Sequence, residues 1–296
     1  MRADRFQHFL AVDWSGATGE RHKGIAIALS KSSGGPPALI ARDTAWSRAG
    51  VLDHLLHDLP DNTLVGLDLG IALPHHDCGA YLPEWDGSPA NARELWALVD
   101  NICGADEHFS VSSFVNHPEL ARYFRRHGGR EGDRFHRTNA HDKRGRFRIT
   151  EQGQQTMGCK PYSNFNLVGA AQVGKSSLTG MRILNRLAGR IPVWPIDPVP
   201  TRGSVIAEIY TGLAAIEAGR SAGRSKIRSI SELNSALEQL DSPPIQAATG
   251  PIDDHSADAL MTAAWMRKIA HQPARWSPKL MTSKIAATEG WTFGAF

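Results

Sequence analysis

Acidic side chains interrupt apolar segments of this 296-residue chain at four places, and burying a charge in such a segment is costly. The positions are Asp13 in "LAVDWSG", Asp68 in "TLVGLDLGIALP", Glu208 in "SVIAEIYTG", and Asp254 with Asp258 in "DDHSADAL". His255 lies between the last two, and helical spacing lets Asp254, His255 and Asp258 face one way. Carboxylates that gather in one place repel one another unless cations lie between them. Oxygen-rich sites of this kind select Mg²⁺ or Mn²⁺.

Two such cations held about 4 Å apart can stabilise both the attacking and the leaving oxygen of a phosphodiester. The predicted chemistry is therefore metal-dependent hydrolysis of DNA or RNA. Each acid also has a purely structural alternative: Asp13 could form a turn, Asp254 could cap its helix, and Glu208 could pair with an arginine. His255 is compatible with a metal ligand, a base or a residue of the first helical turn.

The segment "GAAQVGKSS", residues 169–177, carries the Walker A pattern at each fixed position: Gly169, Gly174, Lys175 and Ser176. In an ATP loop the backbone N–H groups wrap the phosphates, the lysine reaches the β- and γ-phosphates, and the hydroxyl binds magnesium. That loop requires a buried strand before it, whereas "PYSNFNLV" is interrupted by two asparagines. We interpret the segment as a loop before a helix, where Lys175 could contact the phosphate of a nucleic-acid backbone.

Positive charge is concentrated between Arg122 and Arg148, where ten Lys and Arg residues and three phenylalanines accompany three acids. Basic residues mixed with aromatic ones are typical of surfaces that bind phosphate backbones and stack bases. The alternative is a solvated, glycine-rich loop. Another basic run, "GRSAGRSKIR" at 219–228, could line the same groove. The predicted contacts to a nucleic-acid backbone are Arg125, Arg126, Arg144 and Lys175.

The elements that would position these residues follow from the hydrophobic pattern. Strands are expected at 6–12, 23–31, 38–46 and 63–74, and over "IPVWPI" and "SVIAEIYTG". Helices are expected at 51–59, 93–103, 229–240 and 253–270, and after the "GAAQVGKSS" loop. The right-handed crossover rule makes the strand at 63–74 parallel to an earlier strand. If it lies beside the first strand, Asp13 and Asp68 come together.

Composition predicts a globular cytoplasmic protein with a net charge of +3. No apolar segment approaches the roughly 18 to 20 residues of a membrane span, and the first residues do not have the pattern of a signal peptide. Its three cysteines are odd in number and widely spaced, so neither a disulfide framework nor a zinc site is predicted.

The order of three hairpin strands, a helix, a buried acidic strand and a late acidic helix resembles the ribonuclease H fold. "HSADAL" is similar to the His-x-x-Asp-Ala stretch of the RuvC-type Holliday-junction resolvases. "VDWSG", "GLDLGIALP", "AEIYTG", "DDHSADALMTAAW" and "TEGWTFG" together resemble a bacterial family of unknown function, described as predicted nucleases of ribonuclease H fold. The resemblance implies that metal ions are held by Asp13, Asp68 and Asp258, supported by Glu208 and by His255 or Asp254.

The resulting expectation is an α/β protein with a ribonuclease H-like mixed sheet flanked by helices. Residues 1–74 and 190–296 would form the core, and residues 75–189 a large basic insertion. The function expected is a metal-dependent nuclease that uses Mg²⁺ or Mn²⁺ on DNA or RNA. A resolvase-like enzyme would be a homodimer, because it cuts two strands symmetrically.

Two alternatives stay open at this point. The ribonuclease H fold also underlies actin-like kinases and ATPases, whose phosphate loops begin with a strand-ending Asp, much like "VDWSG" and "LDLGIA". That alternative, like the Walker A pattern, predicts binding of magnesium-ATP. The other alternative is a non-catalytic nucleic-acid-binding protein that uses the basic region. The sequence does not distinguish DNA from RNA, or a branched from a single-stranded substrate.

Overall fold

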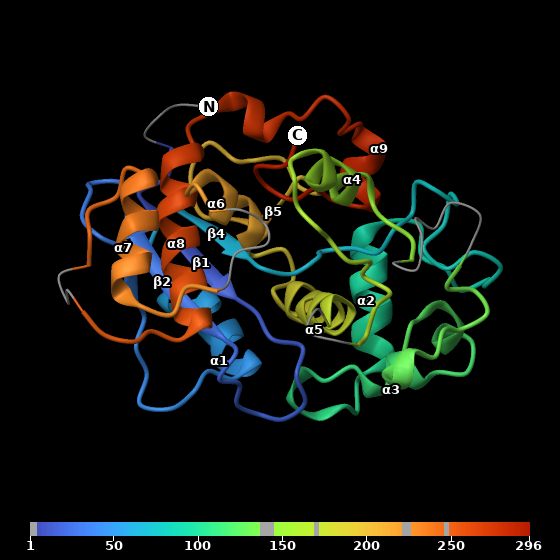
Figure 1. The fold of residues 1–296 in the computed structure, drawn as a ribbon. Coiled ribbons are helices and arrows are strands. Elements are labelled where there is room, and N and C mark those ends of the chain that lie inside the picture. The colour runs from blue at the N-terminus through green and yellow to red at the C-terminus, as the bar shows by residue number, and fades with distance from the viewer. Residues whose placement is uncertain (1–4, 137–144, 169–171, 221–225, 246–248) are drawn as a thin grey trace.

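A six-stranded mixed sheet forms the centre of the computed structural model, which describes residues 5–136, 145–168, 172–220, 226–245 and 249–296 (Figure 1). Its strands are β1 (His8–Asp13), β2 (Ala26–Lys31), β3 (Ala38–Leu39), β4 (Thr63–Leu67), β5 (Val193–Trp194) and β6 (Val205–Glu208). They are ordered β3-β2-β1-β4-β6-β5. The first three strands are antiparallel, and β1, β4, β6 and β5 run parallel. The expected α/β class with a mixed sheet is confirmed.

Alternation along the strands divides the apolar residues between two faces of the sheet. Leu10, Val12, Val65, Leu67 and Ile206 belong to one buried hydrophobic cluster. Their neighbours Phe9, Ala11, Leu64, Val205 and Ala207 belong to a second one. The sheet is therefore buried on both faces, and this explains why β1 and β4 are apolar at nearly every position.

Helices cover both faces (Figure 1). The second cluster is closed by α6 (Thr211–Glu217), α7 (Ile230–Gln239) and α8 (Asp254–Ile269). The first is closed by α1 (Arg48–Asp53), which continues as a π-helical turn (His54–Asp58), and by α2 (Ala92–Ile102) and α5 (Val173–Arg186). The short helices are α3 (Ser112–Asn116), α4 (Ile149–Thr156) and α9 (Ser283–Thr288). The 3₁₀ turns are Glu107–Phe109, Leu120–Tyr123, His127–Gly129 and Pro273–Trp276.

Helix α8 packs directly on the sheet because small residues allow a close approach. The side chain of Asp253 caps it by accepting a hydrogen bond from the Ser256 N–H. A Cβ atom added at Gly66 of β4 would lie 2.6 Å from the sulfur of Met266, so a larger residue would have to displace side chains beneath the helix. The close packing of α8 fixes where the acidic residues of its first turns lie relative to β1 and β4.

Several expected strands are shorter than their apolar patterns, including β2 and β5, which begin later than expected. The strand expected at 38–46 is reduced to β3, where the Ile40 N–H still bonds to Ile27 O before the exposed residues that follow. The strand expected at 63–74 ends at Leu67, because the chain turns sharply and the Leu69 N–H bonds to Leu67 O. The strand over "SVIAEIYTG" ends at Glu208, and α6 follows almost at once.

Residues 75–189, expected to form an insertion, supply two of the helices that cover the sheet. Trp96 of α2 and Leu178 of α5 belong to the same buried cluster as Val12 and Leu67 of the sheet. Helix α5 also lies between β4 and β5 in the chain, in the place of a crossover connection. The domain boundaries at 75 and 189 stay a prediction, but α2 and α5 share the core of the sheet.

Candidate active site

Three carboxylates converge at the ends of β1, β4 and the first turns of α8. Asp13 is the last residue of β1, and Asp68 follows β4, with its N–H donated to Val12 O at 3.0 Å. Because side chains alternate along parallel strands in register, Asp13 and Asp68 both lie on the face that α8 covers. Asp258 lies one turn into α8. The predicted meeting of the first-strand, fourth-strand and late-helix acids is seen.

Burial raises the pKa values of these three groups, and the charge of Asp13 adds to the effect at Asp68 and Asp258. The pKa of Asp68 rises to about 8, chiefly through burial and then through the charges of Asp13 and Asp258. Burial and the charge of Asp13 raise the pKa of Asp258 to about 7. Burial also raises the pKa of Asp13, although the hydrogen bond from His255 opposes the effect. The cluster therefore resists carrying three negative charges unless a cation compensates them.

Two basic side chains from different elements border this cluster. Nδ1 of His255 lies 2.8 Å from Oδ2 of Asp13, and this hydrogen bond raises the pKa of the imidazole. Lys226 pairs with Asp254, and the hydrogen bond from its ammonium lowers the pKa of that carboxyl. Asp254 thus faces Lys226, whereas His255 faces the buried acids. Lys226 was not predicted as a site residue; the only sequence signal for it is its position in the basic run at 219–228.

A cavity of about 420 Å³ opens over the carboxyl ends of the strands, where the carboxylates lie. Its wall includes Asp68, Asp258, Lys226, Tyr162 and Ser176. Tyr162 is 45% exposed, so it presents an aromatic side chain beside the acids. Thr211 donates its hydroxyl proton to Oδ2 of Asp68 at 2.6 Å, which orients that carboxyl group. The site combines acids, a lysine and an exposed ring in one recess.

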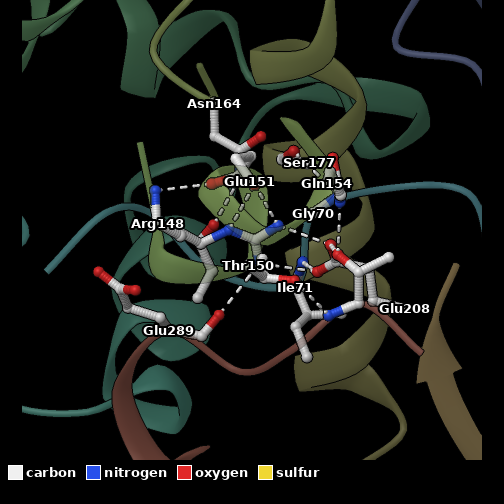
Figure 2. Close-up of polar contacts among 12 residues, drawn as sticks. Gly70, Ile71, Arg148, Thr150, Glu151, Gln154, Asn164, Ser177, Glu208 and Glu289 are labelled. Atoms are coloured by element: carbon white, nitrogen blue, oxygen red, sulfur yellow. Dashed lines mark hydrogen bonds and ion pairs between the residues drawn. The ribbon is translucent and has the colours of Figure 1, made fainter. Parts of the chain in front are cut away.

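Glu208 lines the same cavity but belongs to the opposite face of the sheet. It pairs with Leu67 in register, so its side chain points away from the face that carries Asp68. Both of its oxygens accept hydrogen bonds from the Arg148 guanidinium, at 2.6 and 2.7 Å (Figure 2). The structural alternative, pairing with an arginine, is the one observed, and Glu208 is not part of the carboxylate cluster.

The Arg148 network fixes the segment that follows Asp68 (Figure 2). Glu208 accepts the Ile71 N–H at 2.9 Å, and Ser177 of α5 accepts the Gly70 N–H at 3.2 Å. Arg148 also pairs with Glu151, and it donates to the carbonyl oxygen of Glu289. These contacts hold the chain immediately after Asp68 on rigid supports.

Glu289 is a buried acid that sequence reasoning did not select. Its carboxylate accepts three backbone N–H groups, those of His75, His76 and Ile149, at 2.6 to 2.8 Å. It lies in the "TEGWTFG" segment quoted for the resemblance, and its three amide donors come from parts of the chain far away in sequence. That segment therefore contributes to the support of the site rather than to the carboxylate cluster.

The basic stretch between Arg122 and Arg148 is largely neutralised by ion pairs in its described part. Arg146 is buried against Asp77, Arg148 is buried in the network above, and Arg122 pairs with Asp133. The interleaved rings Phe124, Phe135 and Phe147 are each at most 2% exposed. The prediction that these aromatic residues stack nucleic-acid bases is wrong, because they belong to the protein interior.

The four predicted backbone contacts have different surroundings. Arg125 lies 3.6 Å from Glu131 in an ion pair. Arg126 and Lys175 line a second cavity, separate from the one that holds the carboxylates. Arg144 lies outside the described residues. Only Arg126 and Lys175 are thus seen in a place that could receive a ligand.

The Walker A pattern lacks the backbone geometry of an ATP loop in the described residues. Helix α5 begins at Val173, and residues 161–168 belong to no strand of the sheet. The N–H group of Gly174 is donated to Asn166 O, and those of Lys175 and Ser176 to Gln172 O. Residues 169–171 lie outside the described part. The N–H groups of Gly174, Lys175 and Ser176, which an ATP loop would direct toward a phosphate, are therefore already bonded within the protein.

As placed, no three His, Cys, Asp or Glu side chains of the described residues form a group that could hold a metal ion. Nor does any helix in the described part of the chain have the length and apolar character to cross a membrane. A scan against protein-family models, a search of curated proteins and a search of solved structures each found no match. The function must therefore be argued from the site itself.

Proposed function

We propose that this protein is a metal-dependent nuclease with a ribonuclease H-like fold, acting on DNA or RNA. The observation that carries the proposal is the convergence of Asp13, Asp68 and Asp258 at the ends of β1 and β4 and in the first turns of α8, where Asp68 and Asp258 line one cavity. The strand order also supports it, because three antiparallel strands are followed by β4 and β6 running parallel to β1. This is the order that the sequence resemblance implies.

The chemistry of the donor set fits Mg²⁺ or Mn²⁺. Asp13, Asp68 and Asp258 offer only oxygen ligands, which hard divalent cations prefer. Burial raises the pKa of each carboxyl, and the charge of Asp13 adds to the effect at Asp68 and Asp258, so a cation between them would stabilise the charged forms that burial disfavours. When bound, such an ion would activate a water and stabilise charge on the phosphodiester oxygens.

Other side chains at the site would orient the carboxylates and bind the substrate. His255 fixes the orientation of the Asp13 carboxyl through its Nδ1 contact, and Thr211 does the same for Asp68. The Lys226 ammonium lies in the wall and can neutralise a substrate phosphate. Tyr162 offers an exposed ring on which a base of a single strand can stack.

The test compares wild type with Asp13→Asn and with Asp86→Asn, an exposed acid outside this cavity. Mn²⁺ is titrated into each protein by calorimetry, and each is assayed for cleavage of a mixed set of DNA and RNA substrates with and without Mn²⁺. We expect binding and cleavage in wild type and Asp86→Asn, and loss of both in Asp13→Asn.

Equal Mn²⁺ binding by all three proteins, or none by any, would remove the physical basis of the nuclease proposal. Binding of magnesium-ATP that depends on Lys175 would instead favour the ATPase or kinase alternative. Strand binding without any metal-dependent cleavage would favour the non-catalytic alternative. Sedimentation of the same wild-type preparation tests the homodimer that a resolvase-like activity requires.

A further inference from the structure

A second cavity, of about 320 Å³, lies beside the first turns of α5. One wall is the turn that follows β1, residues 16–18, and another is the segment 126–130 of the basic stretch. The third is α5, through Gln172, Lys175 and Thr179. Residues of the segment 110–116 and residues 167 and 168 complete the lining, so the cavity is built from parts of the chain that are far apart in sequence.

Its lining is positively charged. Arg126, Arg130 and Lys175 contribute three cations, with His127 beside them, and no Asp or Glu is found among the described residues that line it. The cavity over the strand ends, by contrast, is lined by several carboxylates. A recess with three cations and no described acid favours an anion.

Among the described residues, Arg126, Arg130 and Lys175 form no ion pair, whereas other arginines of the basic stretch do. Arg122, Arg146 and Arg148 are paired with carboxylates. Lys175 and Arg130, as far as the described residues go, form no salt bridge. Arg126 donates Nη2 to Val115 O, but its buried Nε has no hydrogen-bond partner within the described chain. A buried donor without a partner is costly, and a ligand oxygen would satisfy it.

Polar side chains complete the lining with groups that suit phosphate oxygens. Ser112 and Asn116 lie in the wall and can donate hydrogen bonds. The backbone N–H groups of Gly174, Lys175 and Ser176 are bonded within the protein, so an anion here would be held by side chains. An ATP loop instead holds phosphate with backbone N–H groups. Lys175 could therefore bind an anion here without the rest of the Walker A motif.

We propose that this cavity binds a phosphate group of a nucleic-acid strand through Arg126, Arg130 and Lys175. The first turn of α5 separates it from the carboxylate cavity: Lys175 faces one, Ser176 faces the other, and Gln172 borders both. A strand whose scissile phosphate lies at the carboxylates would place a neighbouring phosphate here. The identity of the ligand as a strand rests on the proposed function, whereas the anion site rests on the cavity alone.

The test measures binding of a fluorescein-labelled single strand, as DNA and as RNA, by anisotropy in EDTA, where no cleavage occurs. Lys175→Gln and Arg130→Ala are compared with wild type and with Lys279→Ala, an exposed lysine outside the cavity. We expect each cavity variant to bind about tenfold more weakly, since a charge-assisted contact is lost. The slope of log K against log salt should also fall by about 0.7 for each lost contact.

Competition identifies the ligand. Inorganic phosphate at millimolar concentration should displace the strand from wild type and have a smaller effect on Lys175→Gln. If Lys175→Gln and Arg130→Ala bind no more weakly than Lys279→Ala, the cavity is not a phosphate site. If ATP binds in a Lys175-dependent way while the strand does not, the site is for a free nucleotide and the proposal is overturned.

Binding and cleavage can fail separately. Strand binding that depends on Lys175 without cleavage in Mn²⁺ would support this site and contradict the nuclease. If cleavage needs Asp13 while both cleavage and strand binding are unchanged in Lys175→Gln and Arg130→Ala, the nuclease proposal is supported and the phosphate site is contradicted.

Discussion

Replacing Arg148 by Met should destabilise the protein severely, because it leaves two buried carboxylates without their partner. The guanidinium is 1% exposed, and it pairs with Glu151 and Glu208, whose side chains are 5% and 4% exposed. Removing one partner of a buried ion pair typically costs about 3–5 kcal/mol, since the remaining charge cannot be hydrated. Here two charges are left, so we expect a loss of free energy of unfolding at the upper end of that range.

Urea denaturation followed by circular dichroism measures this loss. Arg122→Met is the matched control: it also removes an arginine from the basic stretch, but its pair with Asp133 is exposed to solvent, so stability should change little. Arg148→Met combined with Glu208→Gln should be less destabilised than the sum of the two single variants, because one of the stranded charges is removed. If Arg148→Met were no less stable than Arg122→Met, the buried network would not support the site as we describe.

Three further outcomes are expected. Burial and the charge of Arg48 lower the pKa of His22 to about 4, so the contribution of His22 to stability should be constant above pH 6.5 and fall by about 3 kcal/mol as pH decreases toward 4. The difference between wild type and His22→Gln in thermal melts across this pH range isolates that contribution. Gly16→Ala should lower the free energy of unfolding by about 1–3 kcal/mol, because the added Cβ would lie 2.4 Å from the Ser176 nitrogen; unchanged melting would show that α5 can shift. Mg²⁺ should raise the melting temperature of wild type and not that of Asp68→Asn, and equal shifts in both would place the cation elsewhere.

The carboxylate cluster could be predicted because local patterns determine it. Apolar strands that end in an acid, separated by hairpin-length connections and one crossover helix, leave few arrangements for β1 and β4. The capped start of α8 likewise follows from "DDHSADAL". Asp13, Asp68 and Asp258 were therefore accessible from the sequence, although their shifted pKa values depend on burial that only the packed structure provides.

The placement of Glu208 was also accessible in part. Its strand alternates, and Glu208 shares its parity with Ile206, which lies on the face opposite α8. What the sequence could not supply is the partner, since Arg148 is 60 residues away in a segment without regular periodicity. The basic stretch was interpreted as a nucleic-acid surface for the same reason. Arg146 pairs with Asp77, which is 69 residues away, and neither residue carries a local signal of that pairing.

Asp68 and Glu208 are buried acids whose positions differ by one residue in the register of adjacent strands, and they have different roles. Asp68 and Glu208 lie at the ends of adjacent strands, yet alternation directs Asp68 to the α8 face and Glu208 to the other. Glu208 has an arginine and is a support, whereas Asp68 has only acids and a hydroxyl and is left with a raised pKa. A buried acid without a basic partner adds no stability to a fold, and the cation that we propose would supply the compensation that Asp68 does not receive from Asp13, Asp258 or Thr211.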